Sequence, residues 1–305
     1  MTDNATQHWV MVGCGALAQW LGCSLIRRQP TLSLSVLHRQ QRLRSCNYRL
    51  STNNSEMTIE LPTQHHDDRV ANVVIAAVKA YQVSSLLRQL NEAPWFTDKT
   101  HLILSFNGMH SEPLTPLVSV NQQFLVTTSG VTRDHQGAHL HGIGQSWLGP
   151  MATNNADIDN VFDTLAGAIA PLQGVDDIEQ IRWQKLLINC AINALTVVTD
   201  CVNGELLKAS YQATLHALLS EACAIAAQHG YHFDVEQSLQ QTQQVLSQTA
   251  ANSSSMRQDV LAARPTEIDY LNGFITKRGR QLGIVTPVNE RLWQQVSAIS
   301  YDHPQ

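Results

Sequence analysis

The chain has 305 residues, of which 43% are hydrophobic and 15% charged, and its formal net charge is -5 at pH 7. These values are typical of a globular protein with one large or two medium domains. They give no reason to expect nucleic acid or an anionic membrane as a partner. The sequence contains no apolar run of about 18 residues and no signal-peptide pattern at its N-terminus, so we expect a cytoplasmic protein.

The six cysteines are scattered without a CxxC pair, which favours reduced packing residues in a cytosolic chain. The thirteen histidines include three close pairs, His65-His66, His139-x-His141 and His229-x-x-His232. None of these pairs has a Cys or Glu at ligand spacing, so no metal site is predicted.

The first half of the chain alternates short β-rich runs with segments of helical period, such as 16–28 and 82–90. This alternation predicts a parallel sheet with crossover helices. The segment 135–149, rich in Gly and His, predicts a hairpin or loop at the far edge of that sheet. The expected strands are 9–12, 32–37, 72–78, 101–106, 123–127 and 146–148.

After about residue 150 the strand signals stop and helical patterns follow. Pro171–Gly174, followed by two aspartates, predicts a hinge. We therefore expect an α/β domain of the Rossmann type over 1–175 and an all-helical domain over 176–305. The expected helices are 157–172, 181–195, 213–229, 235–250, 259–279 and 287–300.

A glycine-rich turn, GCGALA, follows the first strand and opens the first helix. Two glycines permit a tight turn and close approach of a pyrophosphate, and the third position of such a motif needs only a small residue. The free N–H groups of a helix N-terminus favour phosphate. The alternative is a tight strand-to-helix connection without a ligand. The predicted cofactor-binding residues here are Gly13, Cys14, Gly15, Ala16, Leu17 and Ala18.

Arg39 stands near the end of the second strand, where an NAD-binding domain would carry an acid. A guanidinium grips a 2′-phosphate, so Arg39 predicts NADP(H), with a solvated basic turn as the alternative. Lys79 and Asn107 follow two further strands, and ligands bind beyond the carboxyl ends of strands in such sheets. Each is either a cofactor contact or simple turn chemistry.

Lys185, Asn189 and Asn193 are spaced four residues apart, which places them on one stripe of an otherwise apolar helix. Burying a lysine and two amides without partners is costly, so the stripe predicts either a polar ligand or a satisfied core network. Desolvation lowers the pKa of a lysine toward neutrality, which suits a general acid. Glu267 predicts either an anchor for a substrate hydroxyl or a helix-terminal charge.

The chain resembles the ketopantoate reductase (2-dehydropantoate 2-reductase) family over nearly its whole length. The lysine–asparagine helix, followed in order by NGEL, SSM and TEIDYLNG, is the most specific part of the resemblance. The segments that carry it are 13–18, 77–83, 107–109, 185–193, 203–206, 254–259 and 266–273. The sequence departs from the family pattern at Ala18, at His110 and at Ala194.

The resemblance implies NADPH-dependent reduction of the C2 ketone of 2-dehydropantoate to (R)-pantoate, within pantothenate and coenzyme A biosynthesis. It implies Lys185 as proton donor and Glu267 as a second catalytic residue that also contacts the cofactor. The implied cofactor contacts include Arg39 on the 2′-phosphate, Lys79, Asn107 and, less securely aligned in a loop, Thr132. The implied substrate contacts are Asn107, Lys185, Asn189, Asn193, Asn203 and Ser255, with Ser254 and Ser255 hard to separate.

Two alternatives remain at this stage. Besides reduction of 2-dehydropantoate, these are reduction of another branched 2-keto acid by the same chemistry and a non-catalytic NADP(H) sensor of the same fold. A small-molecule 2-keto acid is the expected partner of the enzyme, which we expect to be a monomer or homodimer.

Overall fold

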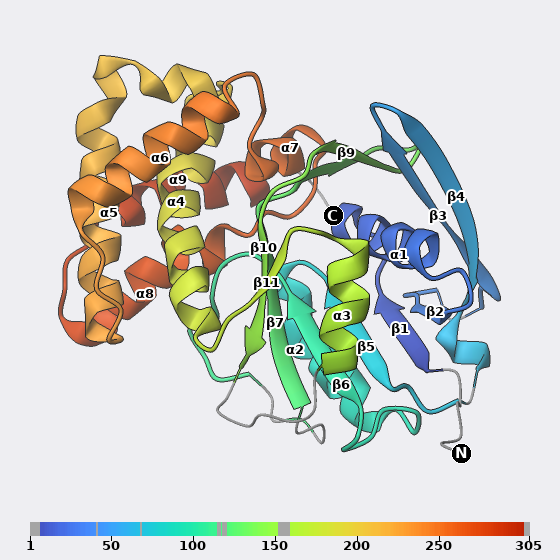
Figure 1. Ribbon diagram of the computed structural model, residues 1–305. Coiled ribbons are helices and arrows are strands. Elements are labelled where there is room, and N and C mark those ends of the chain that lie inside the picture. Colours follow the sequence, from blue (N-terminus) through green and yellow to red (C-terminus); the bar gives the residue numbers. More distant parts are fainter. Residues whose placement is uncertain are drawn as a thin grey trace. The chain divides into compact units, whose positions relative to one another are not determined.

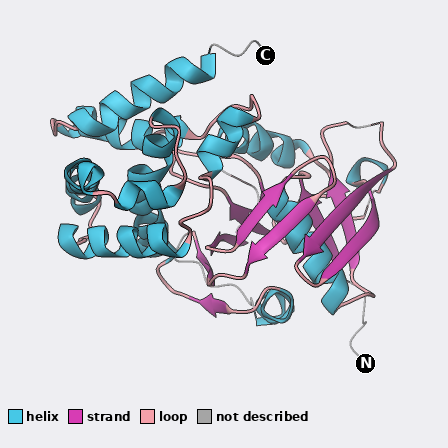
Figure 2. Ribbon diagram, turned by 90° about the horizontal axis from the view of Figure 1, so that it is seen from above, coloured by secondary structure: helices cyan, strands magenta, loops and turns pink. Residues whose placement is uncertain are grey.

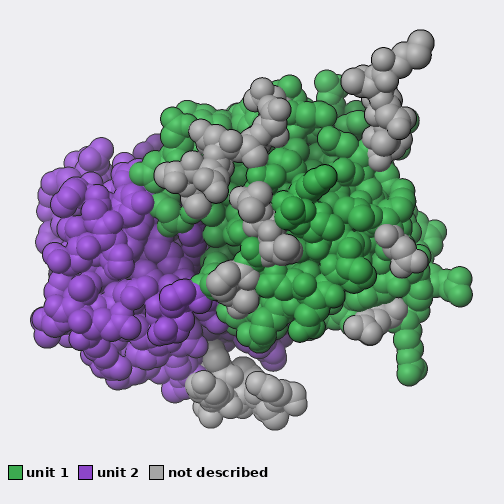
Figure 3. Space-filling model, turned by 90° about the horizontal axis from the view of Figure 1, so that it is seen from below, with its two compact units in different colours: residues 1–106, 114–179 green, residues 107–113, 180–305 purple. Residues whose placement is uncertain are grey.

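The chain forms two compact units, which Figure 3 colours separately. Its computed structural model describes residues 7–40, 42–67, 69–114, 117, 121–151 and 159–301. The first unit comprises residues 1–106 and 114–179, and the second comprises 107–113 and 180–305. The assignment of 107–113 to the second unit had no counterpart in the sequence pattern. The predicted class, an α/β domain followed by helices, is confirmed.

A seven-stranded sheet forms the centre of the first unit, in the order β11-β10-β7-β6-β5-β1-β2 (Figure 1). All six predicted strands are present, but the sheet is mixed because β10 runs antiparallel to β7. Within the predicted hinge, Leu172–Gly174 pairs with β10 as an edge strand. The strands are β1 (His8–Val12), β2 (Ser33–Leu37), β5 (Val73–Ala77), β6 (His101–Ser105), β7 (Asn121–Thr127), β10 (Ser146–Pro150) and β11 (Leu172–Gly174).

Helices cover both faces of this sheet (Figure 1). Helices α1 (Ala16–Arg28) and α3 (Asp159–Ala168) pack together on one face, and α2 (Ala80–Glu92) lies on the other. Alternate residues of the buried strands therefore face different helices, which explains why these strands are apolar throughout rather than alternating. The predicted helix 157–172 ends at Ala168, and residues 157–158 lie outside the described residues.

A second sheet, in the order β4-β3-β9-β8, packs on the outer side of α1. It consists of β3 (Ser45–Thr52), β4 (Ser55–Pro62), β8 (Gly130–Arg133) and β9 (Ala138–Gly142), and the 3₁₀ turn η1 (Gln64–His66) follows β4. Tyr48 packs so closely on Gly22 that a Cβ there would lie 2.7 Å from its ring. The prediction for 135–149 is thus corrected: β9 belongs to this second sheet, whereas β10 joins the main one.

The second unit is built from helices, and every described strand lies in the first (Figure 2). The predicted helix 259–279 is wrong, because the chain breaks at Ala263, with φ of 50°, and at Leu271, whose backbone is not helical. No helix among the described residues is long and apolar enough to cross a membrane. The helices are α4 (Ile178–Val198), α5 (Ala209–Gln228), α6 (Val235–Gln248), α7 (Ser255–Leu261), α8 (Asn272–Leu282) and α9 (Pro287–Tyr301), with the 3₁₀ turns η2 (Asn203–Leu207) and η3 (Ile268–Tyr270).

The core of the second unit surrounds α4. Leu186, Leu187 and Cys190 of this helix are almost fully buried among apolar residues of α5, α8 and α9. Met109, from the segment 107–113, belongs to the same core and is 6% exposed. Through Met109, the segment is therefore anchored in the core of the unit.

Candidate active site

The glycine-rich turn lies at the carboxyl end of β1, where neighbouring strands also end. β1 pairs with β2 as far as Leu37 and with β5 as far as Ala76, so the turn, Arg39 and Lys79 follow strands at the same edge. The order of connections reverses between β1 and β5, and such a switch point is where open α/β sheets bind ligands.

The backbone of the turn fits a dinucleotide. Gly13 has φ of +85°, a conformation that favours glycine, and its N–H donates to Leu37 O at 3.1 Å. Gly15 is the exposed N-cap of α1, and a Cβ placed there would meet no atom within 4 Å. The first N–H groups of a helix have no acceptor within it, so they are available to a phosphate. Ala18 is fully buried, so the third position of the motif is a small packing residue.

Residues of strand β3, in the second sheet, support the glycine-rich turn through hydrogen bonds. The Tyr48 hydroxyl donates to Gly13 O, and Gln19 Nε2 donates to Cys14 O at 3.0 Å. The Arg49 N–H in turn donates to Gln19 Oε1 at 2.9 Å. Sequence reasoning missed these supports because β3 has no glycine or charge signature that marks it as part of a nucleotide site.

Arg39 is exposed just after β2, and its neighbours in the sequence, His38 and Gln40, are not acidic. The local turn is shaped by Gln40, whose N–H donates to His38 Nδ1 at 3.0 Å, and by His65, which donates from Nε2 to His38 O at 2.7 Å. Lys79 is the N-cap of α2, and its N–H donates to Gln82 Oε1 at 3.1 Å.

Thr132 lies on strand β8 rather than in a loop, so that part of the expectation is corrected. Its Oγ1 lies 2.7 Å from His141 Nε2 on β9. Strand β8 packs against α1, the helix that begins in the glycine-rich turn.

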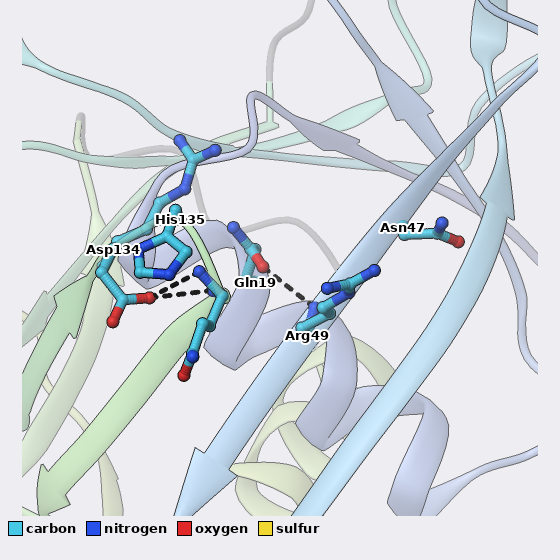
Figure 4. Close-up of a pocket in the computed structure, with 8 residues that line it drawn as sticks. Gln19, Asn47, Arg49, Asp134 and His135 are labelled. Carbon is cyan, nitrogen blue, oxygen red and sulfur yellow. Dashed lines mark hydrogen bonds between the residues drawn. The ribbon is translucent and has the colours of Figure 1, made fainter.

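A polar surface pocket of about 250 Å³ lies on the first unit, between β3 and the turn that joins β8 to β9 (Figure 4). Its lining includes Gln19, Asn47, Arg49, Arg133 and Asp134. No residue predicted to bind the cofactor lines it.

The predicted polar stripe of α4 is present in the second unit. Asn193 is 6% exposed, and Lys185 and Asn189 are half-buried. Burial lowers the pKa of Lys185 to about 8, while the nearby Glu267 carboxylate acts in the opposite direction. The direction predicted for this pKa is therefore confirmed.

Glu267 brings two distant motifs together. It is 4% exposed, and Asn107 Nδ2 donates to its Oε2 at 3.1 Å. The Met109 N–H donates to Tyr270 O at 2.8 Å, and Arg182 Nη2 donates to Gly108 O at 3.3 Å. Asn107, Glu267 and Lys185 thus form one electrostatically connected group within the second unit.

Two departures from the family pattern are accommodated without disturbing this group. The His110 and Tyr270 rings lie 4.7 Å apart, so this histidine packs onto the segment that holds Glu267. Ala194 is fully buried within α4, which continues to Val198.

Asn203 is buried at the start of η2, and its Nδ2 donates to Thr249 Oγ1 at 2.9 Å. Its Oδ1 is buried and finds no hydrogen-bond partner among the described residues. Such an oxygen is an acceptor available to a ligand hydroxyl.

The two serines before α7 differ in their surroundings. Ser254 caps the helix by accepting from the Arg257 N–H at 3.1 Å, and its hydroxyl also lies 2.7 Å from Thr196 Oγ1. Ser255 is exposed as the first residue of α7. Because Ser254 serves the fold, Ser255 is the serine that is accessible to a ligand.

A doubly wound domain with a glycine-rich turn, coupled to a helical domain with an acid-flanked lysine, is the plan of one class of nicotinamide-dependent oxidoreductases. Comparison with known proteins narrows that class. The ketopantoate reductase PanE/ApbA family matches residues 9–153, and its C-terminal domain matches residues 177–300. The chain belongs to the ketopantoate reductase family.

Two relatives illustrate the membership. The 2-dehydropantoate 2-reductase of Vibrio cholerae is 36% identical over 252 residues, which span 80% of this chain and 83% of that protein. The protein of the same name from Yersinia pestis is 30% identical over 306 residues, 96% of this chain and 95% of its own.

Solved structures show the same fold. A PanE/ApbA family ketopantoate reductase from Ralstonia eutropha has a TM-score of 0.82 at 24% identity, covering 97% of this chain and 99% of its own. D-mandelate dehydrogenase, solved with NADH and anilino(oxo)acetate, has a TM-score of 0.84 at 21% identity, covering 96% and 99%.

Proposed function

We propose that the protein is an NADPH-dependent 2-dehydropantoate 2-reductase that forms (R)-pantoate. The group of Lys185, Glu267 and Asn107 carries this proposal, because it provides a proton donor of lowered pKa in a chain 30–36% identical to enzymes of that name. In this role the protein would act in the cytoplasm as a monomer or homodimer.

The first unit would hold the cofactor, whose reduced nicotinamide supplies a hydride when bound. The backbone N–H groups of residues 13–18 would meet the pyrophosphate, and Arg39 would pair with the 2′-phosphate. Lys79 and Thr132 would contact other parts of the bound cofactor. The absence of an acid beside Arg39 supports NADPH rather than NADH.

Lys185 would donate a proton to the C2 oxygen of the substrate as negative charge develops there. A pKa of about 8 makes this ammonium a stronger acid than an ordinary lysine, yet leaves it mostly protonated at neutral pH. The Glu267 carboxylate favours the protonated form, and the hydrogen bond from Asn107 positions that carboxylate.

Three asparagine side chains and one serine hydroxyl would hold the substrate. Asn189, Asn193 and Ser255 are suited to donate to its carboxylate, and the buried Asn203 Oδ1 is suited to accept from its hydroxyl. These contacts would fix the ketone oxygen relative to Lys185.

The test is NADPH oxidation by the purified protein against a panel of 2-keto acids, with Lys185→Ala as the variant. We expect a preference for 2-dehydropantoate and a loss of about 10²–10⁴-fold in kcat for the variant, the range typical of a general acid. Lys208→Ala removes an exposed lysine paired with Glu205 and should keep full activity.

The outcomes separate three functions. Preference for another branched 2-keto acid would support a reductase with a different acyl pocket. Tight NADPH binding without turnover of any 2-keto acid would support a sensor. A Lys185→Ala variant as active as the wild type would refute the proposed proton donor.

A further inference from the structure

We propose that Cys14 and Cys46 form a redox-active dithiol that small disulfides convert reversibly to an intramolecular disulfide. The two Sγ atoms lie 3.3 Å apart, although the cysteines are 32 residues apart in the chain. Both side chains are half-buried, so a small reagent has access to them. Cys14 belongs to the glycine-rich turn, and Cys46 is near the start of β3.

Hydrogen bonds between β3 and the glycine-rich turn hold the two sulfurs near each other. Tyr48, two residues after Cys46, bonds to Gly13, one residue before Cys14. The Gln19 side chain donates to the Cys14 carbonyl and accepts from the Arg49 N–H. The backbone beside each cysteine is therefore held by hydrogen bonds. An S–S bond measures about 2.0 Å, so bond formation requires the sulfurs to approach by roughly 1 Å. A shift of this size lies within the reach of side-chain rotation and a small strand displacement.

The pair is also chemically asymmetric. The hydrogen bond between the sulfurs and the charge of Arg133 lower the pKa of Cys46, and the same hydrogen bond raises the pKa of Cys14. We therefore assign the first attack to Cys46 and the resolving step to Cys14. Cys23 and Cys190 are buried, and desolvation raises the pKa of each, so they are poor nucleophiles.

The reaction balances with a small disulfide as oxidant. The Cys46 thiolate attacks one sulfur of the reagent, forms a mixed disulfide and releases one small thiolate. Cys14 then attacks Cys46 Sγ, and the second small thiolate leaves and takes up the Cys14 proton. The two protein thiols are oxidised, and one small disulfide is reduced to two thiols.

Oxidation should weaken binding of the cofactor, a consequence that rests on the proposed function. Cys14 lies inside the turn that would meet the pyrophosphate, and a bond to Cys46 pulls that turn toward β3. Reciprocally, bound NADPH should slow formation of the disulfide.

The experiment incubates the reduced full-length protein with glutathione disulfide in the presence of a metal chelator. We expect loss of two titratable thiols, an intact mass lower by two hydrogens, and a peptide pair linked through Cys14 and Cys46. Dithiothreitol should reverse all three changes. The chelator matters because Cys14, Cys46 and His38 each place a ligand atom within 4.8 Å of the others, and a soft metal ion would compete for the thiolates.

Three variants test the assignment of roles. Cys14→Ser should retain glutathione on Cys46 as a stable mixed disulfide, and Cys46→Ser should react slowly and form no link. Cys23→Ser is the control and should behave as the wild type. A wild type that keeps glutathione without forming the link, or that reacts equally at Cys23, would overturn the proposal.

Binding of NADPH to the reduced and oxidised protein gives an independent measurement. We expect binding about tenfold weaker after oxidation, within the range typical of coupled sites. Unchanged affinity after complete linkage would refute the coupling. Failure of the reduced protein to bind NADPH would instead refute the proposed function, while the thiol chemistry would stand on its own mass measurement.

Discussion

The protonation state of one residue, Lys185, sets the expected pH dependence of the reaction. Burial lowers its pKa to about 8, so the ammonium loses its proton as the pH rises through that value. In the proposed mechanism the reduction consumes this proton, so kcat/KM should be level on the acid side of about 8 and fall about tenfold per pH unit above it. Steady-state rates from pH 6 to 10 measure the profile.

The control for this profile is the affinity for NADPH over the same range, which should not follow the same curve. A profile that stays level to pH 10 would show that another group delivers the proton.

Selectivity for the cofactor should depend on one side chain, Arg39. A hydrogen bond to a charged group contributes about 1.5–3 kcal/mol, so Arg39→Ala should lower kcat/KM for NADPH roughly 10–100-fold. The value for NADH should change little, because that cofactor lacks the 2′-phosphate.

Arg42→Ala is the matched control, since Arg42 is an exposed arginine of the same basic segment. Its cofactor preference should equal that of the wild type. Equal losses for NADPH in both variants would indicate general attraction by the segment rather than a specific contact.

The placement of single residues could be predicted from the sequence where their spacing carries the information. Lys185, Asn189 and Asn193 share a stripe because helical geometry dictates it, and burial of the lysine follows from its apolar neighbours. The partners of Cys14 escaped prediction because Cys46 and Tyr48 approach the turn only after a second sheet has formed over α1. No local pattern encodes such a long-range approach.

At the level of elements, Asn272 ties α8 to α4 and α9. Its Nδ2 donates to Cys190 O at 3.0 Å and to Asn289 Oδ1 at 2.9 Å, and the side chain is fully buried. Asn272→Ala leaves both acceptors without this donor and creates a cavity. We expect a loss of about 2–4 kcal/mol in the free energy of unfolding, measured by urea denaturation.

Thr276→Val is the control for this variant, because Thr276 is fully buried on the same helix. Its hydroxyl has no hydrogen-bond partner among the residues described, so its removal should not destabilise the protein. Equal destabilisation by the two changes would contradict a specific contribution from the Asn272 hydrogen bonds, because Thr276→Val keeps the side-chain volume and removes no hydrogen bond seen among the described residues.

The elements that sequence predicted best are those with strong periodicity. The helix 16–28 was predicted to the residue, and the buried strands were found from their apolar runs. β3 and β4 were missed because they alternate with many polar residues, several of them exposed. The helix predicted over 259–279 failed because helical period alone ignores the turn chemistry around Ala263 and Pro265.

At the level of the whole molecule, the chain passes from the first unit to the second at residue 107, returns at 114 and leaves again at about 180. The second unit is therefore discontinuous in sequence. A boundary sought from composition alone, near residue 175, identifies only the last of these passages. The core position of Met109 and the Asn107–Glu267 bond explain why the short segment belongs to the helical unit.

Gly108 tests this organisation, because it joins Asn107 and Met109 in the crossing segment. Its φ is +77°, and a Cβ there would lie 2.2 Å from Tyr270 O. Gly108→Ala should detach the segment, removing the burial of Met109 and the bond from its N–H. We expect a cost of about 2–4 kcal/mol, with faster hydrogen exchange in α4 and α8 and unchanged exchange in β1 and β5. kcat/KM should also fall, because Asn107 then no longer positions Glu267.

Gly230→Ala separates this effect from backbone strain. Gly230 has φ of +85° in the same unit, but a Cβ there would meet no atom within 4 Å. Gly230→Ala should therefore lower the free energy of unfolding only by the strain of an alanine in the left-handed region, about 1–2 kcal/mol. The variant should keep its activity. If both variants lost equal stability and activity, the contact with Tyr270 would contribute nothing. The segment 107–113 would then be a passive linker between two independently stable units, contrary to the core position of Met109.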